Sequence, residues 1–160
     1  MPRAVAVLRA GQTRTDEIVD TLLLDYDQRR ALEGVFTGLK GTRIEIAIGN
    51  EAPLATDDCL VLDNGGLIEV VSRPEPLLEL RAGDLPSMAR LAWHLGDRHI
   101  PAQLSERRIR VRRDPATEAL VAALAPVLGL SQLAIEAPFE PEGGAYAGGG
   151  HHHHHGHAHH

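Results

Sequence analysis

The sequence is poor in cysteine, the residue that builds many structural metal sites. It contains one cysteine, Cys59, in 160 residues. A single thiol excludes an internal disulfide and any zinc or iron–sulfur site made of several cysteines. The surrounding residues, DDCLVLDNGG, predict that Cys59 begins a buried strand and behaves as a small, unreactive apolar side chain.

Aromatic residues and long apolar runs are also scarce. Only one Trp, two Tyr and two Phe are present, so any core must consist mainly of Leu, Val, Ile and Ala. No apolar run approaches the roughly 18 to 20 residues that cross a bilayer, and the apolar stretch in MPRAVAVLRAGQ is too short for a signal peptide. We therefore expect a cytoplasmic protein that does not enter a membrane.

Excess positive charge is absent too. The formal net charge is −6 with histidine neutral, which argues against a general nucleic-acid-binding protein. One basic stretch, SERRIRVRRD, alternates arginine with Ile109 and Val111, the period of a strand with one wet face. Two interpretations of Arg108, Arg110 and Arg112 remain open: a solvated sheet face, or a surface for an acidic partner.

The first half of the chain has the pattern of strands. Short apolar segments separated by turn signals fill residues 1–73, and TRIEIAIG places Ile44, Ile46 and Ile48 on one face. The Asn64-Gly65 pair between two apolar runs predicts a hairpin. These features predict an all-β domain over residues 1–73.

From Pro74 onward, strands alternate with longer helical patterns. Asp84 and Asp114 are suited to cap two helices, in GDLPSMARLAWHLG and DPATEALVAALAPVLG, and Gly96 is expected to end the first. Strand-like segments precede, separate and follow these helices. The order βαββαβ over residues 74–140 predicts a ferredoxin-like domain, and the fold class of the whole chain is α+β.

The last segment, residues 141–160, is rich in glycine and then in histidine. Such a composition cannot bury a core, so we expect a disordered tail. Eight of the ten histidines lie in the last ten residues and are candidate metal ligands: His151, His152, His153, His154, His155, His157, His159 and His160. A vector-derived tag is the alternative, although Gly156 and Ala158 interrupt the run.

The two remaining histidines, His94 and His99, lie in the segment LAWHLGDRHIPAQ. Five residues apart, they would point roughly 140° apart on a continuous helix, so they do not form an i, i+4 metal clamp. A lone His99 is either a structural hydrogen-bonding residue or a ligand, and a two-fold axis would supply two imidazoles to one ion. Neither folded half, residues 1–73 or residues 74–140, exceeds about 75 residues, a size at which contact between protomers is expected.

The segment LAWHLGDRHIPAQ, together with a β-rich first half, a βαββαβ second half and a His-rich tail, resembles the UreE urease accessory proteins. The resemblance covers essentially the whole chain. It implies a head-to-head homodimer in which His99 of both protomers binds the metal, with His94 structural or auxiliary. It also implies that the first domain is similar to the peptide-binding domain of an Hsp40 co-chaperone.

Two departures from the family pattern are visible. Asp97 stands where the family usually has Asn, and it could add negative charge near the site or cap the turn. Some members have a His-Asp-His secondary metal site where this chain has Arg113-Asp114-Pro115, so we expect that site to be lost.

The resemblance implies a nickel metallochaperone that delivers Ni²⁺ to apo-urease, with the urease apoprotein and its accessory GTPase complex as partners. Imidazole ligands also suit Zn²⁺ and Cu²⁺. A histidine-rich storage or buffering protein for nickel, zinc or copper is the alternative. The sequence has no nucleophile triad, no phosphate loop and no three-ligand metal set with an adjacent base, so we do not expect an enzyme.

Overall fold

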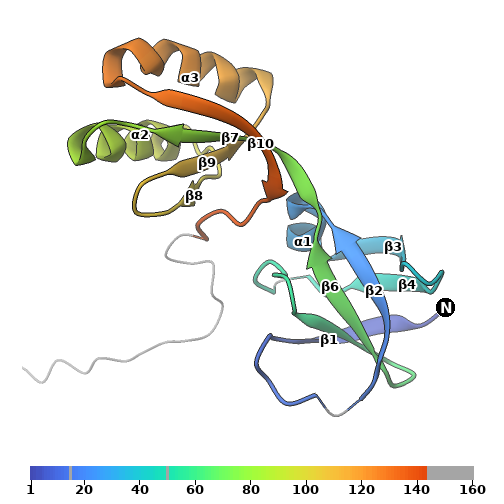
Figure 1. Cartoon of the computed structure of the whole chain (residues 1–160). Coiled ribbons are helices and arrows are strands. Elements are labelled where there is room, and N and C mark those ends of the chain that lie inside the picture. Colours follow the sequence, from blue (N-terminus) through green and yellow to red (C-terminus); the bar gives the residue numbers. More distant parts are fainter. Residues whose placement is uncertain (15, 50, 144–160) are drawn as a thin grey trace, which may run out of the picture.

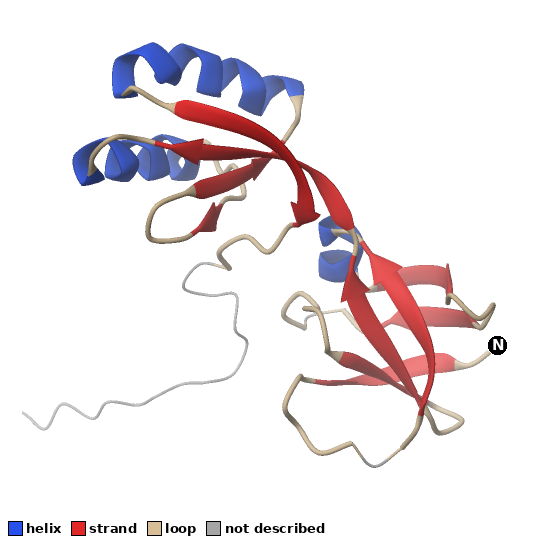
Figure 2. Cartoon of the chain, in the orientation of Figure 1, coloured by secondary structure: helices blue, strands red, loops and turns tan. Residues whose placement is uncertain are grey.

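The protein was analysed as a computed structural model, which describes residues 1–14, 16–49 and 51–143. Two β-sheets and three helices account for the regular structure of these residues (Figure 2). The expected α+β class is confirmed. No helix among the described residues is long and apolar enough to cross a membrane.

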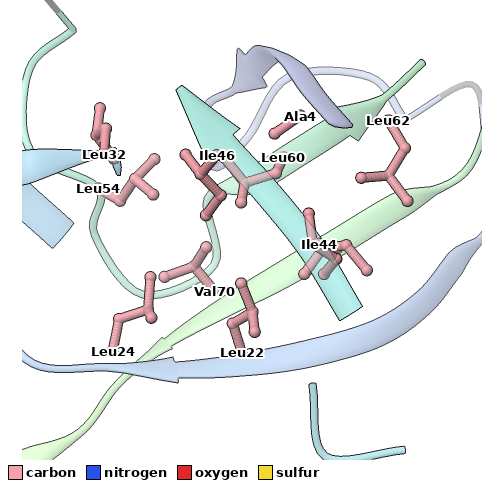
Figure 3. Packing of buried hydrophobic residues seen from close by; sticks show 11 residues of the cluster. Ala4, Leu22, Leu24, Leu32, Ile44, Ile46, Leu54, Leu60, Leu62 and Val70 are labelled. Atoms are coloured by element: carbon pink, nitrogen blue, oxygen red, sulfur yellow. The ribbon is translucent and has the colours of Figure 1, made fainter. Parts of the chain in front are cut away.

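The first sheet contains six strands in the order β2-β6-β5-β1-β4-β3. The strands are β1 (Arg3–Leu8), β2 (Ile18–Leu24), β3 (Glu33–Thr37), β4 (Arg43–Ala47), β5 (Cys59–Leu62) and β6 (Leu67–Ser72). Ile44 and Ile46 point into a closed aliphatic core, as their alternation predicts (Figure 3). The hairpin expected at Asn64-Gly65 joins β5 to β6, and Gly65 has the positive φ of 78° that such a turn requires.

The prediction that residues 1–73 are entirely β-structure is wrong at one place. A short helix, α1 (Tyr26–Ala31), separates β2 from β3. Asp25 caps it reciprocally: its carboxylate accepts from the backbone N–H of Gln28, and the Gln28 side chain accepts from the N–H of Asp25. Six residues are too few to display helical periodicity, so only the D-x-x-Q spacing could have revealed this helix.

Asp20 on β2 organises the turn between β3 and β4. Its buried carboxylate accepts hydrogen bonds from the backbone N–H groups of Thr21, Lys40 and Thr42, at 2.7, 2.9 and 3.1 Å. Burial alone would raise the pKa of this carboxyl, but the hydrogen bonds outweigh it and lower the pKa from 3.8 to about 2. The carboxylate thus fixes a turn that belongs to the other edge of the sheet.

The second sheet is antiparallel, with the order β10-β7-β9-β8. Both long helices cover the same face of it (Figure 1). The elements follow one another as β7 (Pro74–Arg81), α2 (Leu85–Asp97), β8 (Gln103–Leu104), β9 (Ile109–Arg112), α3 (Pro115–Leu128) and β10 (Ser131–Pro138).

The helix caps on the second sheet follow the sequence closely. Asp84 and Asp114 cap α2 and α3 as predicted, each accepting from a backbone N–H three residues later. The expected end of α2 at Gly96 is off by one residue, because the helix continues to Asp97. The residue that adopts the left-handed conformation beyond the helix is His99 and not a glycine.

A small cluster joins the two sheets. Tyr26, Leu77 and Phe139 are buried together, and the Tyr26 and Phe139 rings meet edge to face at 5.5 Å. Arg29, which is 2% exposed, donates to the backbone carbonyls of Leu54 and Phe139. The end of β10 is thereby tied to the first sheet.

Candidate metal site at the end of helix α2

His99 lies at the point where the chain leaves helix α2. The N–H of His99 donates to the carbonyl of Gly96 and the N–H of Ile100 donates to that of Leu95, both at 3.0 Å. This pair of bonds, with a left-handed residue between the helix and Ile100, is a Schellman C-cap. Leu95 and Ile100 pack in the same core cluster, which completes the motif.

The conformation of His99 is unusual for a side chain of its kind. Its φ is +54°, and the position it occupies in a Schellman cap is normally held by glycine. A left-handed conformation costs an L-residue with a Cβ roughly 1 to 2 kcal/mol. The helix end therefore presents an exposed imidazole where glycine would fit with less strain.

A hollow of about 410 Å³ adjoins His99. Its wall is mainly apolar and includes Ala92, Ile100, Pro101 and Leu104. Leu104, which belongs to this wall, is 44% exposed. Trp93 on helix α2 is 64% exposed but is not part of the wall. Exposed large apolar side chains that gather in one patch are typical of a surface that another protein covers.

The chain that leads to the tail runs beside the same hollow. The N–H of Glu140 donates to the side-chain oxygen of Gln103, and that of Glu142 donates to the carbonyl of Ala102, at 3.1 and 2.9 Å. Glu142 and Gly143 therefore line the hollow together with His99. Tyr26 of α1 lies in the wall as well.

Neither Glu142 nor Tyr26 was among the residues that the sequence singled out. Tyr26 reaches the hollow only because α1 packs against the second sheet, and no local pattern announces that contact. A signal for Glu142 could have been its place at the base of the tail, four positions after the end of the last strand.

His94 does not belong to the wall of this hollow. It is half-buried on α2, with its ring edge-on to Trp93 at 5.1 Å between centroids. Its Nδ1 is buried and has no hydrogen-bond partner among the described residues. The structure thus separates the environments of the two histidines of LAWHLGDRHIPAQ.

The side chains at the two departures from the family pattern make contacts within the described chain. Asp97 is the exposed last residue of α2, with its carboxylate 4.0 Å from the guanidinium of Arg98. Asp114 caps α3 through the N–H and hydroxyl of Thr117, both at 2.9 Å. Arg113 pairs with Glu118 at 2.8 Å. All three side chains have structural partners in the described chain.

The remaining candidate ligands divide into two groups. The tail histidines, His151–His155, His157, His159 and His160, lie outside the described residues. Within residues 1–14, 16–49 and 51–143, no three His, Cys, Asp or Glu side chains gather closely enough to hold an ion. Cys59 is buried in the first sheet, as predicted, and burial raises the pKa of its thiol.

Comparison with known proteins decides the family. Residues 75–160 match the family described as UreE urease accessory protein, C-terminal domain. The chain belongs to the UreE family. The matching segment includes the second sheet, both of its helices, the His99 loop and the histidine tail.

Curated UreE proteins match over nearly the whole chain. The urease accessory protein UreE of Bradyrhizobium sp. (strain ORS 278) is 47% identical over 148 residues, which are 92% of this chain and 68% of that protein. The UreE of Bradyrhizobium sp. (strain BTAi1 / ATCC BAA-1182) is 46% identical over 92% of this chain and 69% of its own length. The UreE of Beijerinckia indica subsp. indica is 39% identical over 92% of this chain and 83% of its own length.

Proposed function

We propose that this UreE protein is a nickel metallochaperone that assists urease assembly by delivering Ni²⁺ to apo-urease. The observation that carries the proposal is the left-handed His99, which costs stability at a position suited to glycine. Strain of this kind clusters at functional sites, although Leu32 and Asp57 are also left-handed in this structure. An exposed imidazole held by a helix cap, beside a hollow, is suited to binding a borderline metal ion such as Ni²⁺.

The metal site is completed by a second protomer in this proposal. A two-fold interface brings the same residue from both chains to one axis, so His99 would supply two imidazoles. Trp93 and Leu104 expose apolar surface that such a head-to-head homodimer would cover. Each protomer then needs to contribute only one ligand from its folded part.

Tail histidines would supply further ligands. His151 is eight positions after Gly143, which lies in the wall of the His99 hollow. A chain of that length spans at most about 28 Å when fully extended. Its starting point beside His99 therefore keeps the first tail histidines within reach of an ion on the two-fold axis.

The donor set suits a carrier that must release its cargo. Imidazoles bind Ni²⁺, Zn²⁺ and Cu²⁺ without the thiolates that favour soft, tightly held metals. The affinity order of divalent ions places copper above nickel at such ligands. Nickel selectivity would then come from metal supply and from docking to the urease apoprotein and its accessory GTPase complex.

The rest of the chain has supporting roles in this proposal. Residues 1–73 would form a docking domain of the Hsp40 peptide-binding type, residues 74–140 a ferredoxin-like metal-binding domain, and residues 141–160 a metal-binding tail. The protein would act in the cytoplasm as a carrier and not as an enzyme.

Urease activation under limiting nickel tests the proposal against metal storage. In cells that make urease, His99→Ala should lower urease activity more than deletion of residues 151–160, because a fixed site presents one ion in one geometry. Arg90→Gln, which changes an exposed side chain on helix α2 and leaves every imidazole in place, is the matched control. If the tail deletion abolishes activation and His99→Ala does not, histidine-rich storage or buffering is the better description.

A further inference from the structure

One face of the second sheet is covered by neither α2 nor α3. Alternation along the strands sends Leu78 and Leu80 of β7 into the core beneath the helices, together with Ile109 and Val111 of β9. The residues between them point to the opposite face. The register pairs Glu79 of β7 with Arg110 of β9 there.

Three arginines converge on the Glu79 carboxylate. The same oxygen, Oε1, lies 2.9 Å from Arg108, 3.6 Å from Arg81 and 3.8 Å from Arg110. The Glu79 side chain is 7% exposed, whereas those of Arg81 and Arg108 are 54% and 42% exposed. Arg81, Arg108 and Arg110 around Glu79 are called the arginine face below.

The arginine face has more donors than its one carboxylate can satisfy. Only Arg108 makes a hydrogen bond to Glu79; the other two guanidiniums lie at ion-pair distance. Nε of Arg110 is buried and has no hydrogen-bond partner among the described residues. Three positive charges against one negative leave a local excess of two on a chain whose net charge is −6.

Apolar surface lies on both sides of these charges. Leu133 of β10 is paired in register with Glu79 and is 59% exposed. At the end of β7, Arg81 and Arg107 line a depression of about 310 Å³ with the apolar Leu85 and Met88. The carboxylates of Asp84 and Glu106 lie in the same wall, so the depression itself carries no excess positive charge. Leu85 is 76% exposed. The arginine face is therefore bordered by side chains that can bury apolar groups of a partner.

We infer that the arginine face is a docking surface for an acidic protein segment that also carries apolar side chains. The planar guanidinium matches a carboxylate through two parallel hydrogen bonds, and arginine is enriched in protein interfaces for this reason. A nucleic acid fits less well, because its continuous phosphate charge would meet an otherwise acidic protein with only a small basic area. The surface is distinct from the His99 hollow and shares no residue with it.

Fluorescence anisotropy on the full-length protein tests the inference. The probe is a fluorescein-labelled synthetic peptide of glutamates interrupted by two leucines, at low ionic strength. Arg81→Gln/Arg108→Gln should weaken its binding by about tenfold, and added salt should weaken binding to the unaltered protein. Arg14→Gln/Arg43→Gln removes the same charge from exposed positions in the first half of the chain and should bind the peptide as the unaltered protein does.

Two further probes define what would overturn the inference. A peptide with glutamine in place of every glutamate should bind at least tenfold more weakly. A single-stranded oligothymidine should not compete with the acidic peptide. Equal affinity of the two arginine-to-glutamine double variants, undiminished binding of the glutamine peptide, or displacement by oligothymidine would each contradict the inference. Nickel binding at His99 should be unchanged in both double variants, so this result is separate from the test of nickel delivery.

Discussion

The backbone N–H of Ile100 donates to the carbonyl of Leu95, and this bond closes the end of helix α2. The turn that it makes requires the left-handed conformation of His99, which lies between these two residues. Main-chain hydrogen bonds thus fix the backbone of His99, whereas its imidazole is exposed. A backbone fixed in this way projects the side chain from a defined point at the end of the helix.

Replacing His99 by glycine should separate stability from metal binding. Glycine adopts positive φ without a Cβ clash, so His99→Gly should be more stable to urea than His99→Ala by about 1 kcal/mol in metal-free protein. Both variants should lose the tightest nickel-binding event. Urea unfolding and nickel titration of the two proteins give the comparison, and tight nickel binding by His99→Gly would show that the imidazole is not the ligand.

The Asp20 carboxylate should make stability depend on acidity. Its pKa is about 2 in the folded protein against 3.8 in the unfolded chain, so it contributes roughly 2 kcal/mol above pH 4. This contribution is lost as the pH falls from about 4 through about 2, because the carboxyl is largely protonated in both states only below the folded pKa. Asp20→Asn should therefore be less stable than the unaltered protein at pH 7, and the two should converge below about pH 2. A constant difference between their unfolding free energies across this range would be incompatible with the cause given for the pKa.

Gly38 should tolerate no side chain. A Cβ at this position would lie 2.2 Å from the Asp20 carboxylate, which cannot move without losing its three backbone donors. Gly38→Ala should cost more than about 2 kcal/mol in the free energy of unfolding, because a buried hydrogen-bonded charge is displaced. Gly83→Ala is the control, since nothing lies within 4 Å of its added Cβ. Equal unfolding midpoints for the two variants would mean that the turn adjusts freely.

Local signals predicted most of the second sheet from the sequence. Asp84 and Asp114 are caps whose chemistry acts within three residues, so their helices could be placed closely. The alternation of Ile109 and Val111 with arginine likewise predicted β9 and its two faces. Helix α1 was missed because one and a half turns do not establish a period.

The candidate metal site could be predicted only in part. The motif singled out His99 as a candidate ligand, but its left-handed backbone follows from two hydrogen bonds at the helix end that no residue pattern specifies. The hollow beside it combines residues from α1, α2 and the segment after β10. Contacts between distant segments of this kind depend on how the two sheets pack, as does the pairing of Asp20 with the turn around Lys40.

Nickel stoichiometry and affinity, measured by isothermal titration together with native mass spectrometry, test the proposed dimeric site most directly. Three proteins are compared: the intact chain, His99→Ala, and a chain that ends after Gly150. The intact chain should bind one ion tightly per dimer and further ions more weakly. His99→Ala should lose the tight ion and keep the weak ones, whereas the shortened chain should keep one tight ion per dimer and lose the rest. Loss of the tight ion from the shortened chain, with its retention in His99→Ala, would contradict the assignment of His99 as the shared ligand.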